Sequence, residues 1–408
     1  MTRPARSLST AIAIGLLFLA PARPSWAADL PTGTLPPIRH VFLIVLENKS
    51  FSEAFGPNGA ATYLARTLPA QGALLRNYYA VGHWSLDNYI AIVSGQAPNP
   101  ATQRDCPQTT RFEPSGSGPD AEGELSGSGC VYPASVRTLA DQLEKARLTW
   151  KGYMEDLDVD AARDRPATCS VARIGRTDLT EQASGDDEYA AKHDPFVYFH
   201  SILDDPMRCA AHVVNLEVLA TDLRSVETTP NYSFITPDLC HDGHDPRCTD
   251  GAPGGLAGID GFLRTWVPRI TRSPAFRTDG LLVITFDESD GSPPDGFDAC
   301  CGEKPLPGAP EAPGFQGPGG GRVGAVALSP FIRPGTVSRV PYNHYALLRS
   351  IEDLFDLGHL GYAGGSDLRA FGPDVFSRYR MRPSRRKFTR ATTITAPSRE
   401  TATAVTLK

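Results

Sequence analysis

Apolar residues along the chain form short uninterrupted runs that alternate with segments of helical periodicity. The run at residues 41–46, VFLIVL, is apolar throughout, which is typical of a strand buried on both faces of a sheet. Similar runs predict further strands at residues 73–79, 147–152, 232–236, 280–286 and 323–328.

Amphipathic segments, in which apolar positions recur every three or four residues, lie between these runs. They predict helices at residues 135–147, 216–226, 261–271 and 345–357. Strands that alternate with helices indicate an α/β fold, a mostly parallel sheet with helices on both faces. Because no linker divides the pattern, we expect a single large domain, with long loops at the Gly-, Pro- and Ser-rich residues 100–130 and 291–321.

The two ends of the chain differ in composition from its body. Residues 1–27 place arginines before the apolar run at residues 11–20 and end in Ser-Trp-Ala, a pattern typical of a secretory signal peptide and too short to span a bilayer. Residues 378–408 are basic and lack apolar periodicity, which predicts a disordered tail. We therefore expect a secreted or periplasmic protein with no transmembrane segment and a folded domain at residues 28–377.

The net charge of the chain indicates which classes of binding partner to expect. The formal net charge is −6, and because the tail is strongly basic, the body is more acidic than this value. An acidic body argues against nucleic acid as the main partner. The tail has the charge for a weak contact with an anionic surface, although solvation alone explains its composition.

Eight cysteines behind a signal peptide indicate an oxidising compartment and disulfides. No paired C-x-x-C spacing exists, so a zinc ribbon is disfavoured. The connectivity does not follow from the sequence. Proximity favours Cys106–Cys130 and Cys240–Cys248, with Cys169–Cys209 as a third bridge and the adjacent Cys300 and Cys301 left over.

Polar residues follow three of the predicted strands at the point where each strand ends. In parallel sheets this carboxyl edge is where ligands bind. Carboxylates that converge at ~4 Å repel one another unless a cation lies between them. The pattern therefore predicts a divalent-metal site, and its candidates are Glu47 and Asn48 after the first strand, Asp238, Asp242 and His244 in "PDLCHDGHD", and Asp287 and Glu288 after residues 280–286.

The stretch "GHWSLDNYIAIVSGQ", residues 82–96, places Ser85 near the start of a helical pattern. A serine there is usually a helix cap. The same position offers free backbone N–H groups to a phosphate, and a neighbouring metal would make the hydroxyl a nucleophile. Asn88, one turn further on, could donate to a phosphate oxygen.

Five stretches together carry a resemblance: "VFLIVLENKSFSEAFG", "GHWSLDNYIAIVSG", "PDLCHDGHD", "VITFDESDG" and "PYNHYALLRSIEDLF". Between His40 and Ala363 the chain resembles the secreted bacterial phosphoesterase family, which includes acid phosphatases and phosphatidylcholine-type phospholipases C within the alkaline phosphatase-like superfamily. The commoner form of the serine motif has prolines where Trp84 and Asp87 stand here.

The resemblance implies an alkaline phosphatase-like fold with a catalytic domain at residues 28–377 and one or two divalent metal ions. It implies Ser85 as the nucleophile, with His83 and Asn88 beside it. It makes Glu47, Asn48, Asp287 and Glu288 metal contacts, and it places Asp238, Asp242, His244 and His344 at a second metal or phosphate site. His193 in "KHDPFVYF" either faces the site or is structural. Oxygen ligands favour Mg²⁺, Ca²⁺ or Mn²⁺, whereas the histidines would shift the preference toward Zn²⁺, Mn²⁺ or Fe.

The expected function is that of a metal-dependent hydrolase of phosphoric esters, acting through a phosphoserine. We favour a phosphomonoesterase, because little chain follows the last motif in which to build a lipid-binding domain. A phospholipase C or phosphodiesterase that acts on lipid headgroups is the alternative. A non-catalytic metal- or phosphate-binding protein is disfavoured, because the serine and the acidic ligands are all present.

Overall fold

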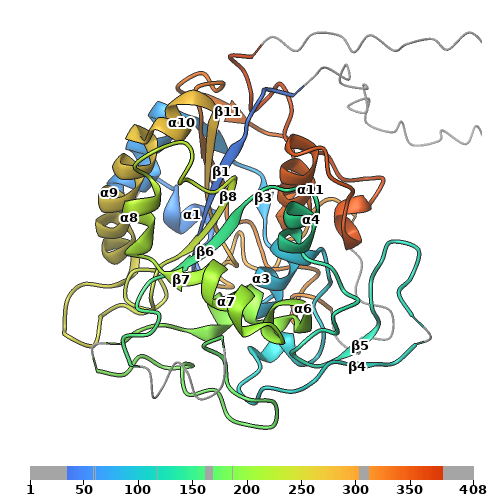
Figure 1. Ribbon diagram of the computed structural model, residues 1–408. Helices are drawn as coiled ribbons and strands as arrows, with labels where there is room; N and C mark the ends of the chain where they lie inside the picture. The colour runs from blue at the N-terminus through green and yellow to red at the C-terminus, as the bar shows by residue number, and fades with distance from the viewer. Residues whose placement is uncertain are drawn as a thin grey trace, which may run out of the picture. The chain divides into compact units, whose positions relative to one another are not determined.

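Parallel strands form the centre of the structure, a computed structural model that describes residues 35–379 apart from 58, 60, 117, 161–168, 186 and 303–311 (Figure 1). Within these residues, eight strands form one sheet in the order β11-β2-β10-β9-β1-β8-β6-β7. Their bounds are β1 His40–Leu46, β2 Ala73–Leu75, β6 Trp150–Met154, β7 Val213–Asn215, β8 Tyr232–Thr236, β9 Gly280–Phe286, β10 Ala325–Leu328 and β11 Thr336–Ser338. Only β10 among them runs antiparallel to its neighbours, β9 and β2.

Two small sheets complete the strands of the described residues. They pair β3 Tyr78–Tyr79 with β12 Tyr342–Asn343, and β4 Glu113–Pro114 with β5 Gly127–Ser128. The helices are α1 Phe51–Ala54, α2 Leu68–Gln71, α3 Ser85–Ser94, α4 Leu139–Lys145, α6 His200–Leu203, α7 Pro206–His212, α8 Val218–Asp222, α9 Gly255–Arg272, α10 Pro274–Asp279 and α11 His344–Leu354. Short 3₁₀ or π turns lie at Tyr63–Thr67, Thr102–Arg104, Ala191–His193, Pro195–Tyr198 and Gly361–Gly364.

Helices cover both faces of the sheet. Figure 1 shows α9 and α10 on one side and α3, α4 and α11 on the other. Every residue of β1 and β9 is buried as a result, which explains why their sequences are apolar without alternation. The predicted α/β class, with a mostly parallel sheet and a single domain, is therefore confirmed; Leu35–Met381 form one compact unit.

The predicted strands agree with the structure best where the apolar run is long. Residues 232–236 and 280–286 are strands at the predicted bounds, and β1 begins one residue early. The run at 73–79 divides into β2 and β3, and β6 begins three residues later than predicted. The short edge strands β7 and β11 were not predicted, because three residues carry no readable alternation.

The predicted helices exist but differ in length. The helix expected at 135–147 begins at Leu139, because Thr138 and Asp141 form a capping box there. The helix expected at 216–226 is only α8, and the one expected at 261–271 extends over all of α9. In the described residues, no helix combines the length and apolarity needed to cross a membrane.

Four disulfides join the eight cysteines. The structure therefore gives the connectivity, which the sequence alone did not determine. The pairs are Cys106–Cys130, Cys169–Cys209, Cys240–Cys248 and Cys300–Cys301. One of them, Cys240–Cys248, lies in the loop that follows β8. The predicted signal peptide, and the predicted tail apart from Arg378 and Tyr379, lie outside the described residues.

Candidate active site

The ends of β1 and β9 bring Glu47 and Asp287 together. Leu46 pairs with Phe286 in the parallel register, and the Asp287 N–H donates to the Leu46 carbonyl at 2.8 Å. The Asp287 carboxylate then accepts a hydrogen bond of 2.9 Å from the Asn48 N–H. Adjacent strands therefore deliver two carboxylates to one point, as the sequence pattern predicted.

The loop after β8 adds a third carboxylate above β1. The Glu47 N–H donates to the Asp242 carbonyl at 2.9 Å. The Asp242 side chain is fully buried, and one of its oxygens accepts a hydrogen bond of 2.8 Å from the His244 N–H. Glu47, Asp242 and Asp287 thus form a buried acidic cluster at the carboxyl edge.

Ser85 is the first residue of α3, and its hydroxyl donates to the Glu47 carboxylate. The hydroxyl makes no capping hydrogen bond, and Trp84 occupies the N-cap position. The N–H of Leu86 is satisfied from another loop, by Asp105 at 2.9 Å. The structure therefore contradicts the helix-cap interpretation of Ser85 and directs its oxygen to the acidic cluster.

His193, which the sequence left between two interpretations, lies inside this cluster. Its Nε2 is 3.3 Å from a Glu47 oxygen, and its Nδ1 is 3.6 Å from an Asp242 oxygen. Tyr89 of α3 stacks on the imidazole with ring centroids 5.2 Å apart. Packing from the serine helix thus holds the imidazole between two carboxylates.

Burial and mutual repulsion perturb the carboxyl groups of the cluster. Burial, and then the negative charge of Glu47, raise the pKa of both Asp242 and Asp287 well above the usual value. Burial would also raise the pKa of Glu47, but the positive charge of His193 and its hydrogen bond hold that pKa well below its usual value. Three carboxyl groups this close together cannot all ionise without strong repulsion. Such an arrangement is typical of a site that binds a cation.

The donor atoms suit a divalent metal ion. Glu47, His193 and Asp242 each offer one ligand atom, and these atoms lie within 4.8 Å of one another. The second carboxylate oxygens of Asp242 and Asp287 are buried and accept no hydrogen bond from the described residues. Since buried polar atoms are normally satisfied, these unpaired oxygens fit a bound cation.

Glu288 contacts the loop before Ser85. It accepts hydrogen bonds from the Trp84 N–H at 2.9 Å and from His83 Nδ1 at 2.5 Å. The second ring nitrogen of His83 donates to the Gly296 carbonyl at 2.9 Å. Burial would lower the pKa of His83, but the hydrogen bond to Glu288 and its charge raise the pKa overall. His83 thus positions Glu288, and both of its ring nitrogens have hydrogen-bond partners.

Asn88 does not offer a donor to a ligand. Its amide donates to the carbonyls of Gly82 and Trp84 at 2.9 and 3.0 Å. Its oxygen accepts from the N–H groups of Val81 and Gly82 at 2.9 and 3.1 Å. The expectation that Asn88 donates to a phosphate oxygen is therefore wrong in this conformation, because both amide hydrogens shape the loop that presents Ser85.

His344 is also not placed as a metal ligand. Its Nδ1 lies 3.0 Å from the Tyr78 hydroxyl, and its Nε2 lies 2.6 Å from the Asp287 carbonyl. Burial lowers the pKa of this histidine to about 4, so the ring is neutral. One ring nitrogen donates and the other accepts, so neither is free to bind a metal ion. The expectation that His344 is a metal ligand is therefore contradicted, and His344 instead holds the backbone carbonyl of Asp287.

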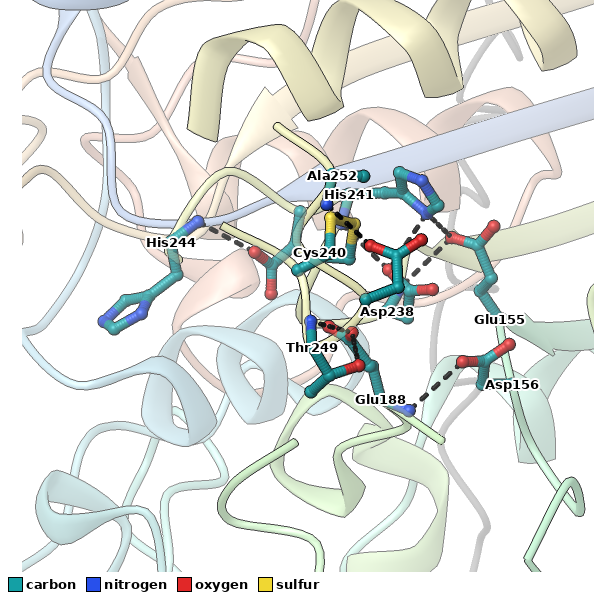
Figure 2. Close-up of a disulfide and its surroundings, with 12 residues drawn as sticks. Glu155, Asp156, Glu188, Asp238, Cys240, His241, His244, Thr249 and Ala252 are labelled. Carbon is teal, nitrogen blue, oxygen red and sulfur yellow. Dashed lines mark hydrogen bonds and ion pairs between the residues drawn. A yellow bond between two sulfur atoms is a disulfide. The ribbon is translucent and has the colours of Figure 1, made fainter. Parts of the chain in front are cut away.

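Asp238 belongs to a second group, next to the Cys240–Cys248 disulfide (Figure 2). His241 Nδ1 lies 3.0 Å from Asp238 and 3.1 Å from Glu155, and hydrogen bonds to these carboxylates raise the pKa of His241 to about 11. The positive imidazolium neutralises part of this group. Asp238 is therefore paired with His241 and does not join Glu47, contrary to the prediction.

A cavity of about 250 Å³ opens beside Ser85. His244 lies on its wall but outside the buried cluster, because its Nδ1 pairs with Asp245 at 2.8 Å. Figure 2 shows its ring pointing away from the disulfide. The lining residues are Asn48, His83, Trp84, Ser85, Asp105, Lys192, His244 and Glu288.

Lys192 and Asp105 are site residues that the sequence analysis missed. The Lys192 ammonium lies 3.3 Å from an Asp105 oxygen, and although burial opposes it, the charges of Asp105 and Glu47 raise the pKa of Lys192. Lys192 therefore stays positive beside Ser85. The sequence signal for Lys192 was its position in "KHDP", directly before His193.

One serine, two carboxylates, two imidazoles and one ammonium thus line the cavity at the carboxyl edge of the sheet. A model of the phosphoesterase family matches residues 58–358. The chain therefore belongs to the phosphoesterase family, as the resemblance predicted.

Curated relatives agree with this assignment. A phosphatidylinositol-3-phosphatase of Mycobacterium tuberculosis is 24% identical over 371 residues, 89% of this chain and 94% of that protein. An acid phosphatase of Aspergillus fumigatus is 28% identical over 251 residues, 62% of this chain and 44% of that protein. A phosphate-repressible acid phosphatase of Penicillium chrysogenum is 28% identical over 249 residues, 60% of this chain and 47% of that protein. The chain thus spans about half the length of these fungal relatives.

Solved structures resemble the chain more distantly. A protein of the alkaline phosphatase superfamily from Vibrio parahaemolyticus shares 12% identity with a TM-score of 0.41, over 80% of this chain and 69% of that one. A sulfatase-like structure from Bacteroides thetaiotaomicron, itself described as putative, shares 10% identity with a TM-score of 0.46, over 85% of this chain and 76% of that one.

Proposed function

We propose that this protein is a metal-dependent phosphomonoesterase that forms a phosphoserine on Ser85. The observation that carries the proposal is the hydrogen bond from the Ser85 hydroxyl to Glu47, at the N-terminus of α3 and inside the acidic cluster. A capping serine would bond to its own helix. Membership of the phosphoesterase family supports a hydrolase of phosphoric ester bonds.

The residues that would hold the metal are Glu47, Asp242, Asp287 and His193, with Asn48 and Glu288 on the cavity side. A mixed carboxylate and imidazole set suits Zn²⁺, Mn²⁺ or Fe²⁺ better than Mg²⁺ or Ca²⁺. When bound, a divalent ion would offset the negative charge that develops on the serine oxygen and the phosphoryl group.

The chain's own groups account for the remaining requirements. The Glu47 carboxylate is the acceptor for the hydroxyl proton of Ser85, so that Oγ can form a bond to phosphorus while the bond to the leaving oxygen breaks. The leaving alkoxide takes up a proton from solvent water and departs as the alcohol. Water then cleaves the phosphoserine, which releases inorganic phosphate and restores Ser85. Lys192 and the N-terminus of α3 stabilise the phosphoryl oxygens throughout.

The relatives favour a phosphomonoester as the substrate. Those compared are named for phosphatase activity, and the mycobacterial relative is aligned over nearly its whole length. A phosphodiester or a phospholipid headgroup remains the alternative outcome of the test. We also propose export from the cytoplasm, because four disulfides suit an oxidising compartment.

The test compares wild-type protein with Ser85→Ala on p-nitrophenyl phosphate, bis-p-nitrophenyl phosphate and phosphatidylcholine. We expect hydrolysis of the monoester, and a loss of at least about 10³-fold in kcat for the Ala variant. Acid quench of the wild type during turnover should leave phosphate on the peptide that contains Ser85. Near-wild-type turnover by Ser85→Ala would refute the covalent mechanism, and faster diester hydrolysis would replace the monoesterase proposal.

A further inference from the structure

A second cavity, of about 450 Å³, adjoins the cavity beside Ser85. The two cavities share Asn48, His83, Trp84 and Glu288 as walls. If Ser85 attacks phosphorus in line, the leaving group lies on the side of phosphorus opposite Oγ. The adjoining cavity offers space for the alcohol part of a bound ester.

One of the four residues shared by the two cavities, Trp84, is a large aromatic residue that is exposed to solvent. Trp84 is 50% exposed, and its backbone has φ 76° and ψ 148°, a conformation that is strained for a residue other than glycine. Its N–H donates to Glu288, and its carbonyl accepts from Asn88 at 3.0 Å. Two hydrogen bonds thus maintain a strained backbone that presents a large apolar ring to the cavity. The commoner family motif has proline at this position.

Two further aromatic rings line the same cavity. Phe297 packs against the His83 imidazole with ring centroids 4.7 Å apart. Phe315 lines the cavity between Gly314 and Gln316 and also has a positive φ, of 54°. Trp84, Phe297 and Phe315 come from two segments distant in sequence, so their presence around one cavity is a property of the fold.

The charge of this cavity excludes a second anionic group. Glu288 and Asp290 are its acidic lining residues. His83 is the basic residue among the described lining residues, and it is already paired with Glu288 at 2.5 Å. A phosphate or carboxylate on the leaving group would meet the Asp290 carboxylate, and the described lining residues include no lysine or arginine to offset the repulsion.

We propose that Trp84, Phe297 and Phe315 form a subsite for the leaving group, and that it selects phosphomonoesters of uncharged, ring-bearing alcohols. This inference rests on the proposed function, because it assigns the alcohol side of the same reaction. Stacking of a planar ring on Trp84 and the phenylalanines provides the affinity. The acidic wall of Asp290 provides the discrimination against anionic alcohols.

The test compares benzyl phosphate with ethyl phosphate, whose leaving groups are both primary alkoxides and differ mainly in the ring. For wild-type protein we expect kcat/KM to be at least about tenfold higher for benzyl phosphate, the scale of one apolar contact in a binding pocket. Trp84→Ala should reduce this ratio toward unity, and Trp84→Phe should restore most of it. Met207→Ala, which removes another exposed apolar side chain far along the sequence on α7, is the control and should leave the ratio unchanged.

Charge selectivity is measured with 4-carboxybenzyl phosphate. We expect its kcat/KM to be lower than that of benzyl phosphate by about tenfold or more, and Asp290→Asn to recover part of the loss. Phosphocholine serves as the cationic comparison, and a preference for it over benzyl phosphate would overturn the assignment to uncharged alcohols.

Two results would overturn the aromatic subsite itself. One is an equal kcat/KM for benzyl and ethyl phosphate in the wild type. The other is a Trp84→Ala variant that loses the same factor on both, since this would show that Trp84 only positions Ser85. Failure of the proposed function gives a different result, namely that wild-type protein hydrolyses none of the esters and forms no phosphoserine.

Discussion

The Lys192 ammonium lies 3.3 Å from one carboxylate oxygen of Asp105, while the other oxygen of that carboxylate accepts the N–H of Leu86 at 2.9 Å. Asp105 therefore ties the cation to the first turn of the serine helix. The cavity beside Ser85 is otherwise lined by acidic and neutral groups and by histidines. Among the described lining residues, Lys192 is the lysine that can meet a phosphoryl oxygen.

We predict that Lys192→Met lowers kcat/KM by about 10²-fold, the usual effect of removing one stabilising donor from a transition state. Lys192→Arg should retain more activity because it keeps the charge. The inhibition constant of inorganic phosphate is the second measurement, and it should rise in the Met variant. An unchanged phosphate affinity in a stable Met variant would show that Lys192 serves only to hold Asp105.

Metal binding should depend on Asp242 and His193 but not on Asp238. We expect Asp242→Asn and His193→Ala to lower metal content after dialysis and to weaken metal affinity at least about tenfold, because each removes a donor from the buried cluster. Asp238→Asn is the matched control, since that carboxylate pairs with His241. Elemental analysis of the three variants checks this.

Chelation gives the complementary measurement. Removal of the metal should abolish turnover and lower the thermal midpoint, because the carboxyl groups of the cluster then repel one another. Full turnover by metal-free protein would contradict the metal assignment. Loss of metal from Asp238→Asn alone would return that residue to the ligand set.

His344 should contribute to stability rather than to ligation. His344→Phe leaves the Asp287 carbonyl and the Tyr78 hydroxyl without their buried partner, which costs about 1–3 kcal/mol for each group left unsatisfied. We expect a lower free energy of unfolding with metal stoichiometry retained. Denaturant unfolding and elemental analysis of the same sample separate the two roles. A variant as stable as the wild type but free of metal would show that the imidazole is a ligand.

The sequence predicted the elements that position the site, because β1 and β9 are long apolar runs that only a doubly covered sheet can bury. It also predicted which strand ends converge, since parallel neighbours share a carboxyl edge. This reasoning placed Glu47 and Asp287 together, as the structure does.

The orientation of the site's side chains could not be predicted from the sequence in the same way. Asn88 and His344 stand at the expected positions, but their polar atoms bond to backbone and to Tyr78, and no pattern in the sequence encodes those partners. Lys192 and His193 belong to a 3₁₀ turn, Ala191–His193, which lacks the periodicity of a helix or strand. Their approach to Glu47 depends on the tertiary fold.

Two buried glutamates that do not line the cavities beside Ser85 predict how stability depends on pH. Burial raises the pKa of Glu124 and of Glu352 to about 8. Glu124 accepts hydrogen bonds from the N–H groups of Ala97 and Tyr362, and Glu352 accepts from that of Leu360. Both carboxyl groups therefore fix the segment around residues 360–362.

The direction of the effect follows from proton uptake. In the unfolded chain a glutamate has a pKa of about 4.3, so between that value and about 8 the folded protein binds more protons than the unfolded chain. The stabilisation from the protonated carboxyls is complete below about pH 4.3 and is lost as pH rises toward 8. We therefore expect the thermal midpoint to fall across this range.

Glu352→Gln tests this prediction directly. The amide keeps an acceptor for the N–H of Leu360 but cannot ionise. At pH 9 we expect the variant to be more stable than the wild type by on the order of 1 to 3 kcal/mol, and at pH 4.5 nearly equal. Glu122→Gln, at an exposed position, is the control and should follow the wild type at both values. Thermal unfolding from pH 4 to 9 provides the measurement, and a Glu352→Gln curve parallel to that of the wild type would show that this carboxyl group is already ionised in the folded protein.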